Sequence, residues 1–433
     1  MRIGWATPWN AKSAIASFSQ TVVAELDARG IEVEILRLET GEEVRLPPLP
    51  TSGYRSTRFA SEVSTEELAG FDVIFANIGD HVSFHGQVFD LFFRTPCVGI
   101  IHDADLTNIA KYTCAMLSGD ELSCGIRSAA EAVSDGPVEE CSMRLLRWIG
   151  AASCGGIVRS RHYLEPFASL CAGEVVVVPP VYPDIGAVAY RKPIEAGQLR
   201  LATVGTAGAF SCISKVVRAL SSSPDLLRAV SYKVIGAISD EDRARLNDLV
   251  ISNGIAPIEF TGSVNINDIN NNLRDVDIIS LLYSNFYSDS YNSLILCMLS
   301  ACPVLVSDDS FCADVPDDFV LKCRPGDEAQ DSARYLEAFL RAPGSARAFG
   351  LGARAFALGH FSATSYVDAI LDLAPRAAAA RPIVAPAARI GRILNCLGTR
   401  DDDPVIGRLT QNMMEMLGHL PAIESFGQGP LKR

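Results

Sequence analysis

The chain has 433 residues, of which 48% are hydrophobic and 21% charged, and its formal net charge is −13. Single hydrophobic cores stop growing at about 250–300 residues, so this length predicts two domains. The acidic balance argues against a nucleic-acid partner, which requires a basic surface. The N-terminal MRIGWATPWN lacks the apolar stretch of a signal peptide, and no apolar run reaches the roughly 18 residues of a membrane span.

Cysteine usage indicates the cellular compartment. The twelve cysteines form no Cys-x-x-Cys pair and no zinc-type cluster with histidine. Several, such as Cys97 and Cys297, stand inside apolar runs, where a cysteine is expected to be a small buried hydrophobe. We therefore expect a reducing, cytoplasmic environment.

Strands and helices alternate through the first half of the chain. Residues 15–29 show the apolar spacing of a helix, and Gly30 follows as its stop. Strands rich in Val and Ile are predicted at 2–6, 31–38, 71–76, 97–101, 156–159 and 175–179. Strands of this kind, separated by helices, indicate a parallel sheet that is covered on both faces.

A polar stretch rich in Pro and Gly, residues 183–198, interrupts this pattern before it restarts. Strands are predicted at 199–204, 231–235, 258–260, 277–282 and 303–307, with helices between them. We therefore expect an α/β protein with two doubly wound parallel sheets, one in residues 1–190 and one in 199–373. Ligands of such sheets bind at the carboxyl ends of the strands, and two such domains in tandem are expected to face each other across a cleft.

The last part of the chain, 374–433, is predicted to be a linker followed by a helical tail. The low-complexity segment 374–388 (APRAAAARPIVAPAA) has the composition of a linker. The following amphipathic helix carries Arg389, Arg392 and Arg400. A basic helix of this kind can lie on a membrane surface or pack back on the body of the protein, and both alternatives stay open.

Five stretches, taken together, resemble a known family. They are 8–19 (PWNAKSAIASFS), 77–103, 155–167 (GGIVRSRHYLEPF), 204–220 (VGTAGAFSCISKVVRAL) and 260–308. Their order and content resemble the retaining GT-B glycosyltransferases, especially the bacterial group that builds polysaccharides and O-antigens and includes many mannosyltransferases. The similarity extends over about 1–372.

The resemblance implies two Rossmann-like domains and a hexosyltransferase. Such an enzyme moves a hexose from a nucleotide-sugar donor to a glycan, lipid-linked or protein acceptor, with retention of configuration. Mannose from a guanosine donor is the first hypothesis for the donor. Three Asp-x-Asp pairs occur, at 103–105, 240–242 and 275–277, but the GT-B group needs no metal, so neither a metal nor another cofactor is expected.

The donor site implied by the resemblance lies in the second half. Lys215 follows the loop that starts at Gly205, and it would be the diphosphate-binding lysine at the start of a helix. The arginine that the family usually has shortly before this lysine is missing from AFSCIS. The alternative for Lys215 is a solvated helix residue.

The donor helix departs further from the family. Two glutamates eight positions apart would fall at Ser288 and Leu296, and neither residue is acidic. Asp289 stands next to the first position and would take the sugar-side catalytic role. The remaining donor contacts would come from Ser288, Ser290, Asn292 and Ser293. The alternative is that these residues form a helix-capping turn.

In the first half, strand-end residues would contact the sugar or the acceptor. The resemblance implies a catalytic role for His102, next to Asp103, and sugar or acceptor contacts for His85. Asn10 and Ser13 belong to the corresponding loop after the first strand. Histidine can hydrogen-bond a sugar hydroxyl or take a proton near pH 7, although a single histidine is more often structural.

Two other functions fit the sequence. The missing arginine and glutamates are also expected of a catalytically degenerate GT-B protein that serves as a partner or regulatory subunit. A GT-B-like sugar-nucleotide epimerase is the second alternative, and it would require more carboxylates than the sequence places near the site. A periplasmic binding protein is disfavoured because no signal peptide is seen.

Overall fold

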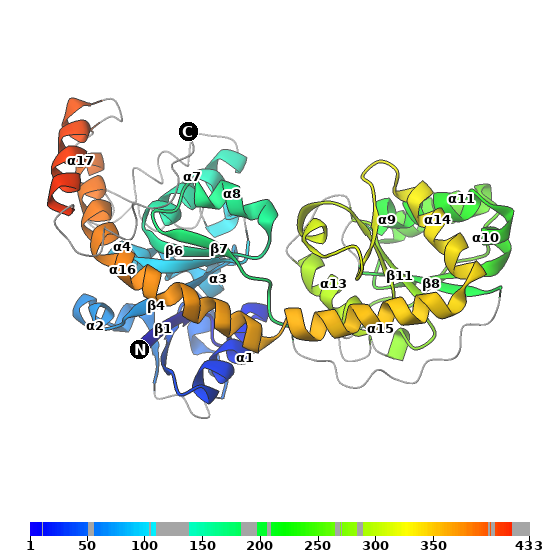
Figure 1. Cartoon of the computed structure of the whole chain (residues 1–433), viewed down its shortest axis with the longest axis horizontal. Helices are drawn as coiled ribbons and strands as arrows, with labels where there is room; N and C mark the ends of the chain where they lie inside the picture. The colour runs from blue at the N-terminus through cyan, green and yellow to red at the C-terminus, as the bar shows by residue number, and fades with distance from the viewer. Residues whose placement is uncertain are drawn as a thin grey trace. The chain divides into compact units, whose positions relative to one another are not determined.

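The structure is a computed structural model that describes residues 1–10, 12–50, 56–103, 105–109, 138–182, 197–205, 209–264, 269, 271–283, 289–396, 399 and 403–417. The chain divides into two compact units (Figure 1). The first comprises Met1–Arg159, Tyr163–Val178 and Val367–Arg433, and the second comprises Ser160–His162 and Pro179–Tyr366. Among the residues described, no helix is both long and apolar enough to cross a membrane.

The first unit contains a seven-stranded sheet in which every pair of neighbours is parallel. Its strands are β1 (Arg2–Thr7), β2 (Glu32–Arg37), β3 (Thr57–Phe59), β4 (Val73–Ile78), β5 (Cys97–Ile101), β6 (Ser153–Val158) and β7 (Glu174–Val177). The spatial order is β3-β2-β1-β4-β5-β6-β7, so the direction of winding reverses between β1 and β4. β4, β5 and β6 are buried along their whole length, which explains their nearly continuous apolar sequences.

Helices pack against this sheet and build its core. They are α1 (Ala14–Ala28), α2 (Thr65–Ala69), α3 (Val82–His85), α4 (Val88–Arg94), α7 (Val138–Ala151) and α8 (Leu164–Ala168), with short 3-10 turns η1 (Gly41–Arg45) and η2 (Ala60–Glu62). The 3-10 turn η3 (Arg161–Tyr163) contains residues of both units. α1 buries Ala16, Val22, Val23 and Leu26, the face that the apolar spacing predicts.

The second unit contains a six-stranded parallel sheet. Its strands are β8 (Leu199–Val204), β9 (Val230–Ile235), β10 (Glu259–Phe260), β11 (Ile278–Leu281), β12 (Val304–Ser307) and β13 (Leu321–Cys323). The spatial order is β10-β9-β8-β11-β12-β13, so the winding reverses between β8 and β11. The predicted α/β class with two doubly wound parallel sheets is confirmed.

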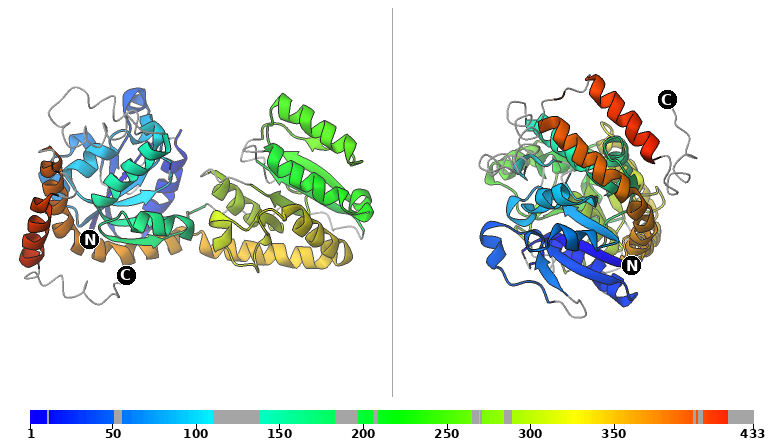
Figure 2. Two further views of the ribbon diagram at one scale, coloured as in Figure 1. Left: turned by 90° about the horizontal axis from the view of Figure 1, so that it is seen from above. Right: turned by 90° about the vertical axis from the view of Figure 1, so that its left-hand side faces the viewer.

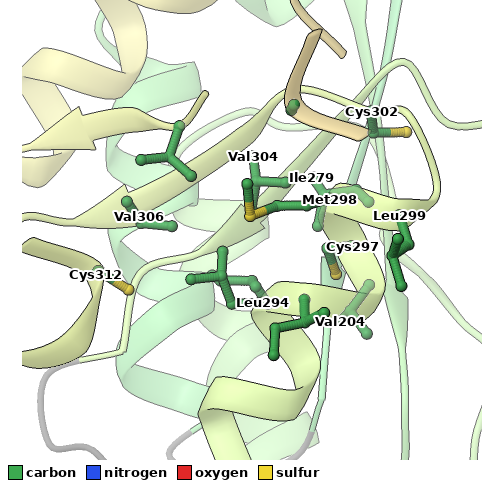
Figure 3. Close-up of a cluster of buried hydrophobic side chains, with 14 of the residues drawn as sticks. Val204, Ile279, Leu294, Cys297, Met298, Leu299, Cys302, Val304, Val306 and Cys312 are labelled. Atoms are coloured by element: carbon green, nitrogen blue, oxygen red, sulfur yellow. The ribbon is translucent and has the colours of Figure 1, made fainter. Parts of the chain in front are cut away.

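The helices of the second unit are α9 (Ala209–Ser221), α10 (Pro224–Ala229), α11 (Asp240–Ser252), α13 (Asp289–Leu299), α14 (Glu328–Arg341) and α15 (Pro343–His360), with the 3-10 turn η4 (Ser310–Asp314). In Figure 3, Leu294 and Met298 of α13 lie in one cluster with Ile279, Val304 and Val306 of the strands. Cys297, Cys302 and Cys312 belong to the same cluster and are free thiols. These cysteines are buried small hydrophobes, as predicted.

The expected linker 374–388 is wrong. This segment lies inside α16 (Ala363–Cys396), a single helix that contains three prolines. Its apolar side chains are buried in the first unit, and they include Ala374, Ala377, Ala380 and Val384. The guanidinium of Arg381 donates to the carbonyl oxygens of Leu68 and Phe71 and to Thr95 Oγ1. The composition that suggested a linker is also rich in alanine, and docking onto the first unit outweighs the cost of the prolines.

Beyond Val384 the helix becomes more exposed. Arg389 and Ile393 are exposed, and α17 (Pro404–Leu417) lies beside the end of α16 (Figure 2). The buried part of α16 therefore ends near Val384, and both alternatives for the basic helix that carries Arg389 stay open. The side chain of Arg392 and the whole of Arg400 lie outside the described residues.

Candidate functional site

In the second unit, a tight turn lies at the point where the winding reverses. β8 and β11 are neighbours there, and such switch points are where doubly wound sheets bind ligands. Gly205 follows β8 with a φ of +103°, a region that L side chains rarely adopt. A Cβ on Gly205 would lie 2.2 Å from Tyr283 Oη, which donates to the carbonyl of Val204 at 2.5 Å. The turn therefore requires glycine.

Lys215 reaches the same edge of the sheet from α9. Its Nζ donates to the carbonyl of Leu282, just after β11, at 3.1 Å and to Glu328 Oε1 at 2.6 Å. The Lys215 side chain is 17% exposed. The expected helix start at this lysine is wrong, because α9 begins at Ala209, so the amides of its first turn precede Lys215. The ammonium group nevertheless lies where the sequence places it, at the carboxyl end of the strands.

Glu328 is the acidic partner that the sequence did not reveal. It is the first residue of α14, and its Oε2 accepts from the backbone N–H of Gly326 at 2.9 Å. Burial opposes ionisation of this carboxyl, but the hydrogen bonds from Lys215 and the backbone outweigh it and lower the pKa of Glu328. The site therefore contains an ion pair of Lys215 and Glu328.

The predicted donor helix begins at Asp289, as α13. Ser288 and the side chains of Asp289 and Ser290 lie outside the described residues. Asn292 and Ser293 are half-buried in the first turns of the helix, which leaves their predicted donor contacts untested. Leu296 is 4% exposed and points into the interior, where a ribose-binding acid would not be useful.

In the first unit, the loop after β1 is held by a buried carboxylate. Asn10 is fully buried, its Nδ2 donates to Glu39 Oε1 at 3.1 Å, and its Oδ1 accepts from the N–H of Lys12. Ser13 caps α1, with its Oγ accepting from Ala16 N at 3.3 Å. Both predicted residues thus fix the loop that they belong to.

Glu39 follows β2 and is itself fully buried. Its Oε1 accepts from the N–H of Trp9 at 2.9 Å, and Arg37 donates to the same oxygen at 2.9 Å. Arg37 is also buried and lies over the ring of Phe59. Sequence patterns do not indicate this pair, because charged residues at a strand end are ordinary.

Both ring nitrogens of His102 are occupied within the protein. Arg159 Nη2 donates to Nδ1 at 2.6 Å, so the proton is on Nε2, which donates to Asn77 Oδ1 at 2.8 Å. Burial, and then the charge of Arg159, lower the pKa of His102 well below its ordinary value. The ring is therefore neutral and has no nitrogen left for a substrate in this arrangement, although its predicted role stays untested.

His85 has a different arrangement. Its Nδ1 donates to the carbonyl of Asn77 at 3.0 Å, which leaves Nε2 as an unprotonated acceptor. Burial lowers the pKa of His85 to about 4. A Cβ on Gly79 would lie 2.8 Å from His85 Nε2 and 3.2 Å from Asp103 Oδ2, so both atoms lie close to this glycine. The His85 side chain is 1% exposed, so this nitrogen lies inside the first unit, next to Gly79.

Asp103 helps to hold the loop after β4. Its Oδ2 accepts from the N–H of Asp80 at 3.1 Å. The Asp80 carboxylate in turn accepts from Asn108 Nδ2 at 2.6 Å and from the N–H of Ile109. His85 and His102 thus both hydrogen-bond to Asn77 at the carboxyl edge of β4 and β5, and Asp103 holds the adjoining loop close to Gly79.

The Asp-x-Asp pairs have other partners in the structure. Asp277 accepts from the guanidinium of Arg200, and the N–H of Asp242 donates to Ser239, the N-cap of α11. Within the described ranges, no group of three or more His, Cys, Asp or Glu side chains is arranged to hold a metal ion.

Comparisons with known proteins establish the fold. No family model matches the chain, and no curated protein matches it. Sucrose-phosphate synthase from Thermosynechococcus elongatus is similar over 87% of this chain and 98% of its own, with a TM-score of 0.54 at 15% identity. Anabaena HepE in complex with UDP and glucose is similar over 86% and 98%, with a TM-score of 0.53 at 13% identity. A trehalose-phosphate synthase from Burkholderia vietnamiensis is similar over 88% and 98%, with a TM-score of 0.54 at 13% identity.

These structures are GT-B glycosyltransferases, and the chain has their two-sheet α/β fold. At this level of identity the likeness defines the fold, whereas the reaction must be argued from the site.

Proposed function

We propose that this protein is a glycosyltransferase that moves a hexose from a nucleotide-sugar donor to a glycan, lipid-linked or protein acceptor, with retention of configuration. The observation that carries the proposal is Lys215, whose ammonium group lies at the switch point of the second sheet, beside the end of β11. The GT-B fold supports it, and so do the UDP and UDP-glucose complexes of HepE.

The proposed donor site stabilises the leaving diphosphate. Lys215 supplies a positive charge, and the Gly205 turn lets the backbone approach the phosphates without a side chain in the way. Asp289 is proposed to contact the transferred sugar, with Ser288, Ser290, Asn292 and Ser293 as further donor contacts. No metal is part of the proposal.

The first unit is proposed to bind the acceptor and the sugar. His85 is proposed to contact a hydroxyl of the sugar or the acceptor, because its Nδ1 donates to the carbonyl of Asn77 and leaves Nε2 as a hydrogen-bond acceptor. Asn10 and Ser13 shape the loop after β1, and Asp103 holds the loop that carries His85. We propose that His102 holds the side chain of Asn77 through Oδ1, while the backbone carbonyl of Asn77 fixes the tautomer of His85.

Release of nucleoside diphosphate tests the proposal. The protein is incubated with UDP-, GDP- and ADP-linked hexoses, with and without simple glycan acceptors, and the products are followed by NMR. We expect release of one nucleoside diphosphate and a product with the donor's anomeric configuration. An inverted product would refute retention, an isomerised donor would indicate an epimerase, and no turnover with any donor would favour a non-catalytic partner.

A further inference from the structure

A buried carboxylate forms an ion pair with Lys215, the residue to which the proposed function assigns binding of the donor diphosphate. Glu328 Oε1 lies 2.6 Å from Lys215 Nζ and 3.4 Å from Ser307 Oγ, while Oε2 accepts from the N–H of Gly326. The Glu328 side chain is 10% exposed. Four elements therefore meet at this carboxylate: α9, the end of β12, the turn before α14, and α14 itself.

The charges of this pair cancel. For the part of the chain that the structure describes, Lys215 is the one cationic side chain in contact with Glu328. The basic residue that the sequence lacks in AFSCIS would have left a net positive charge here. As it stands, a diphosphate that approaches Lys215 also approaches a carboxylate that the same ammonium holds in place.

We propose that Glu328 shares Lys215 with the diphosphate of the donor and limits the affinity of the site for the nucleoside diphosphate product. This inference rests on the proposed function. Glu328 is a positioning residue in it, because it acts through Lys215 rather than on the reacting atoms.

The Glu328 carboxylate repels the nucleoside diphosphate product more strongly than it repels the sugar-nucleotide donor. The diphosphate of a sugar nucleotide is a diester with about two negative charges, whereas a free nucleoside diphosphate has a terminal phosphate that ionises near pH 6 and gains about one more. Repulsion between charges a few ångströms apart in a partly buried site is strong enough to change binding by an order of magnitude or more. Glu328 therefore favours release of the product over release of the donor.

The acidic residue at this edge of the sheet comes from α14 and not from the donor helix, α13. Leu296, at the position where the family places a glutamate, is buried in the core. The acid at the edge of the sheet comes instead from α14, 113 residues beyond Lys215. The N–H of Gly326 donates to its Oε2 and helps to hold the carboxylate at this edge.

Binding of UDP, GDP and ADP to full-length variants by titration calorimetry tests the inference. In Glu328→Gln we expect the nucleoside diphosphate that binds the wild type to bind at least about tenfold more tightly, with a smaller gain for its sugar nucleotide. The uncharged nucleoside should bind equally to both proteins, a result that a purely structural role would not produce. Glu328→Asp, which keeps the charge, should show no such gain.

Asp327→Asn is the matched control. Asp327 is the preceding residue and pairs with Arg324, so it changes the same charge without touching Lys215. Its nucleotide affinity should stay within about twofold of the wild type. Two results would overturn the inference alone, provided that the wild type binds a nucleoside diphosphate. One is unchanged or weaker binding of that ligand by Glu328→Gln, and the other is an equal gain in affinity in Asp327→Asn. No binding of any nucleotide to the wild type would overturn the proposed function and this inference together.

Discussion

The guanidinium of Arg159 donates to Nδ1 of His102 at 2.6 Å, although 57 residues separate the two in the sequence. The other ring nitrogen donates to Asn77, so His102 is a buried link between β4 and the end of β6. Through these two hydrogen bonds the His102 ring helps to hold the folded structure together.

His102→Ala should therefore lower the free energy of unfolding by about 2–4 kcal/mol, because it removes the hydrogen bonds that the ring makes with Arg159 and Asn77 and opens a cavity. Denaturant unfolding measures the change. His81→Ala, which removes an exposed histidine from the adjoining turn, should change stability by less than about 0.5 kcal/mol. Unchanged stability of His102→Ala together with lost turnover would show that the ring serves the substrate instead.

His85 predicts a pH dependence of stability. Burial holds its pKa at about 4, below the value of about 6.5 in the unfolded chain, so the unfolded chain binds more protons between these values. Stability is therefore fully present above about pH 6.5 and falls by about 3 kcal/mol as the pH drops toward 4. His85→Gln should show a shallower slope in this window, measured by denaturant unfolding at several pH values. An identical slope would show that folding does not lower the pKa of His85.

The buried Arg37–Glu39 pair predicts a large effect on the loop after β1. Glu39→Ala should cost about 3–5 kcal/mol of stability, because Arg37 is left buried without a counter-charge and the N–H of Trp9 loses its acceptor. Glu42→Ala removes an exposed carboxylate nearby and serves as the control. Equal melting temperatures of the two variants would refute the role of Glu39.

The turn at Gly205 can be tested by a pair of substitutions. Gly205→Ala should destabilise the protein by at least about 2 kcal/mol, through the positive φ and the clash with Tyr283 Oη. Tyr283→Phe removes the clashing oxygen but leaves the ring carbon at an ordinary distance of 3.5 Å. The double variant should therefore lose less stability than the sum of the single variants. Strict additivity in denaturant unfolding would show that the close approach does not occur.

The fold could be predicted because its strands are buried and apolar throughout. Runs such as 73–78 and 97–101 leave no other position than the centre of a parallel sheet. The helical structure of the segment 374–388 could not be predicted, because alanine and proline are compatible with both a linker and a docked helix. Contacts such as those of Arg381 distinguish the two.

Part of the candidate site was also accessible from sequence. His85, His102 and Lys215 follow or adjoin predicted strands, so the topology places them at the carboxyl edges. Their partners Arg159 and Glu328 could not be found, because these contacts join residues that are 57 and 113 positions apart. These partners affect the chemistry that each side chain can perform. Arg159 donates a hydrogen bond to His102, and the Glu328 carboxylate balances the charge of Lys215.

The most direct test of the account is a thermal-shift panel of nucleoside diphosphates and sugar nucleotides on the wild type, Lys215→Ala and Arg218→Ala. A ligand at 100 times its dissociation constant stabilises the folded protein by about 2.7 kcal/mol. We expect one base to raise the melting temperature of the wild type and of Arg218→Ala, whose arginine is exposed on the same helix, but not that of Lys215→Ala. An unchanged wild-type melting temperature with every nucleotide, or an equal shift in Lys215→Ala, would contradict a donor site at this lysine.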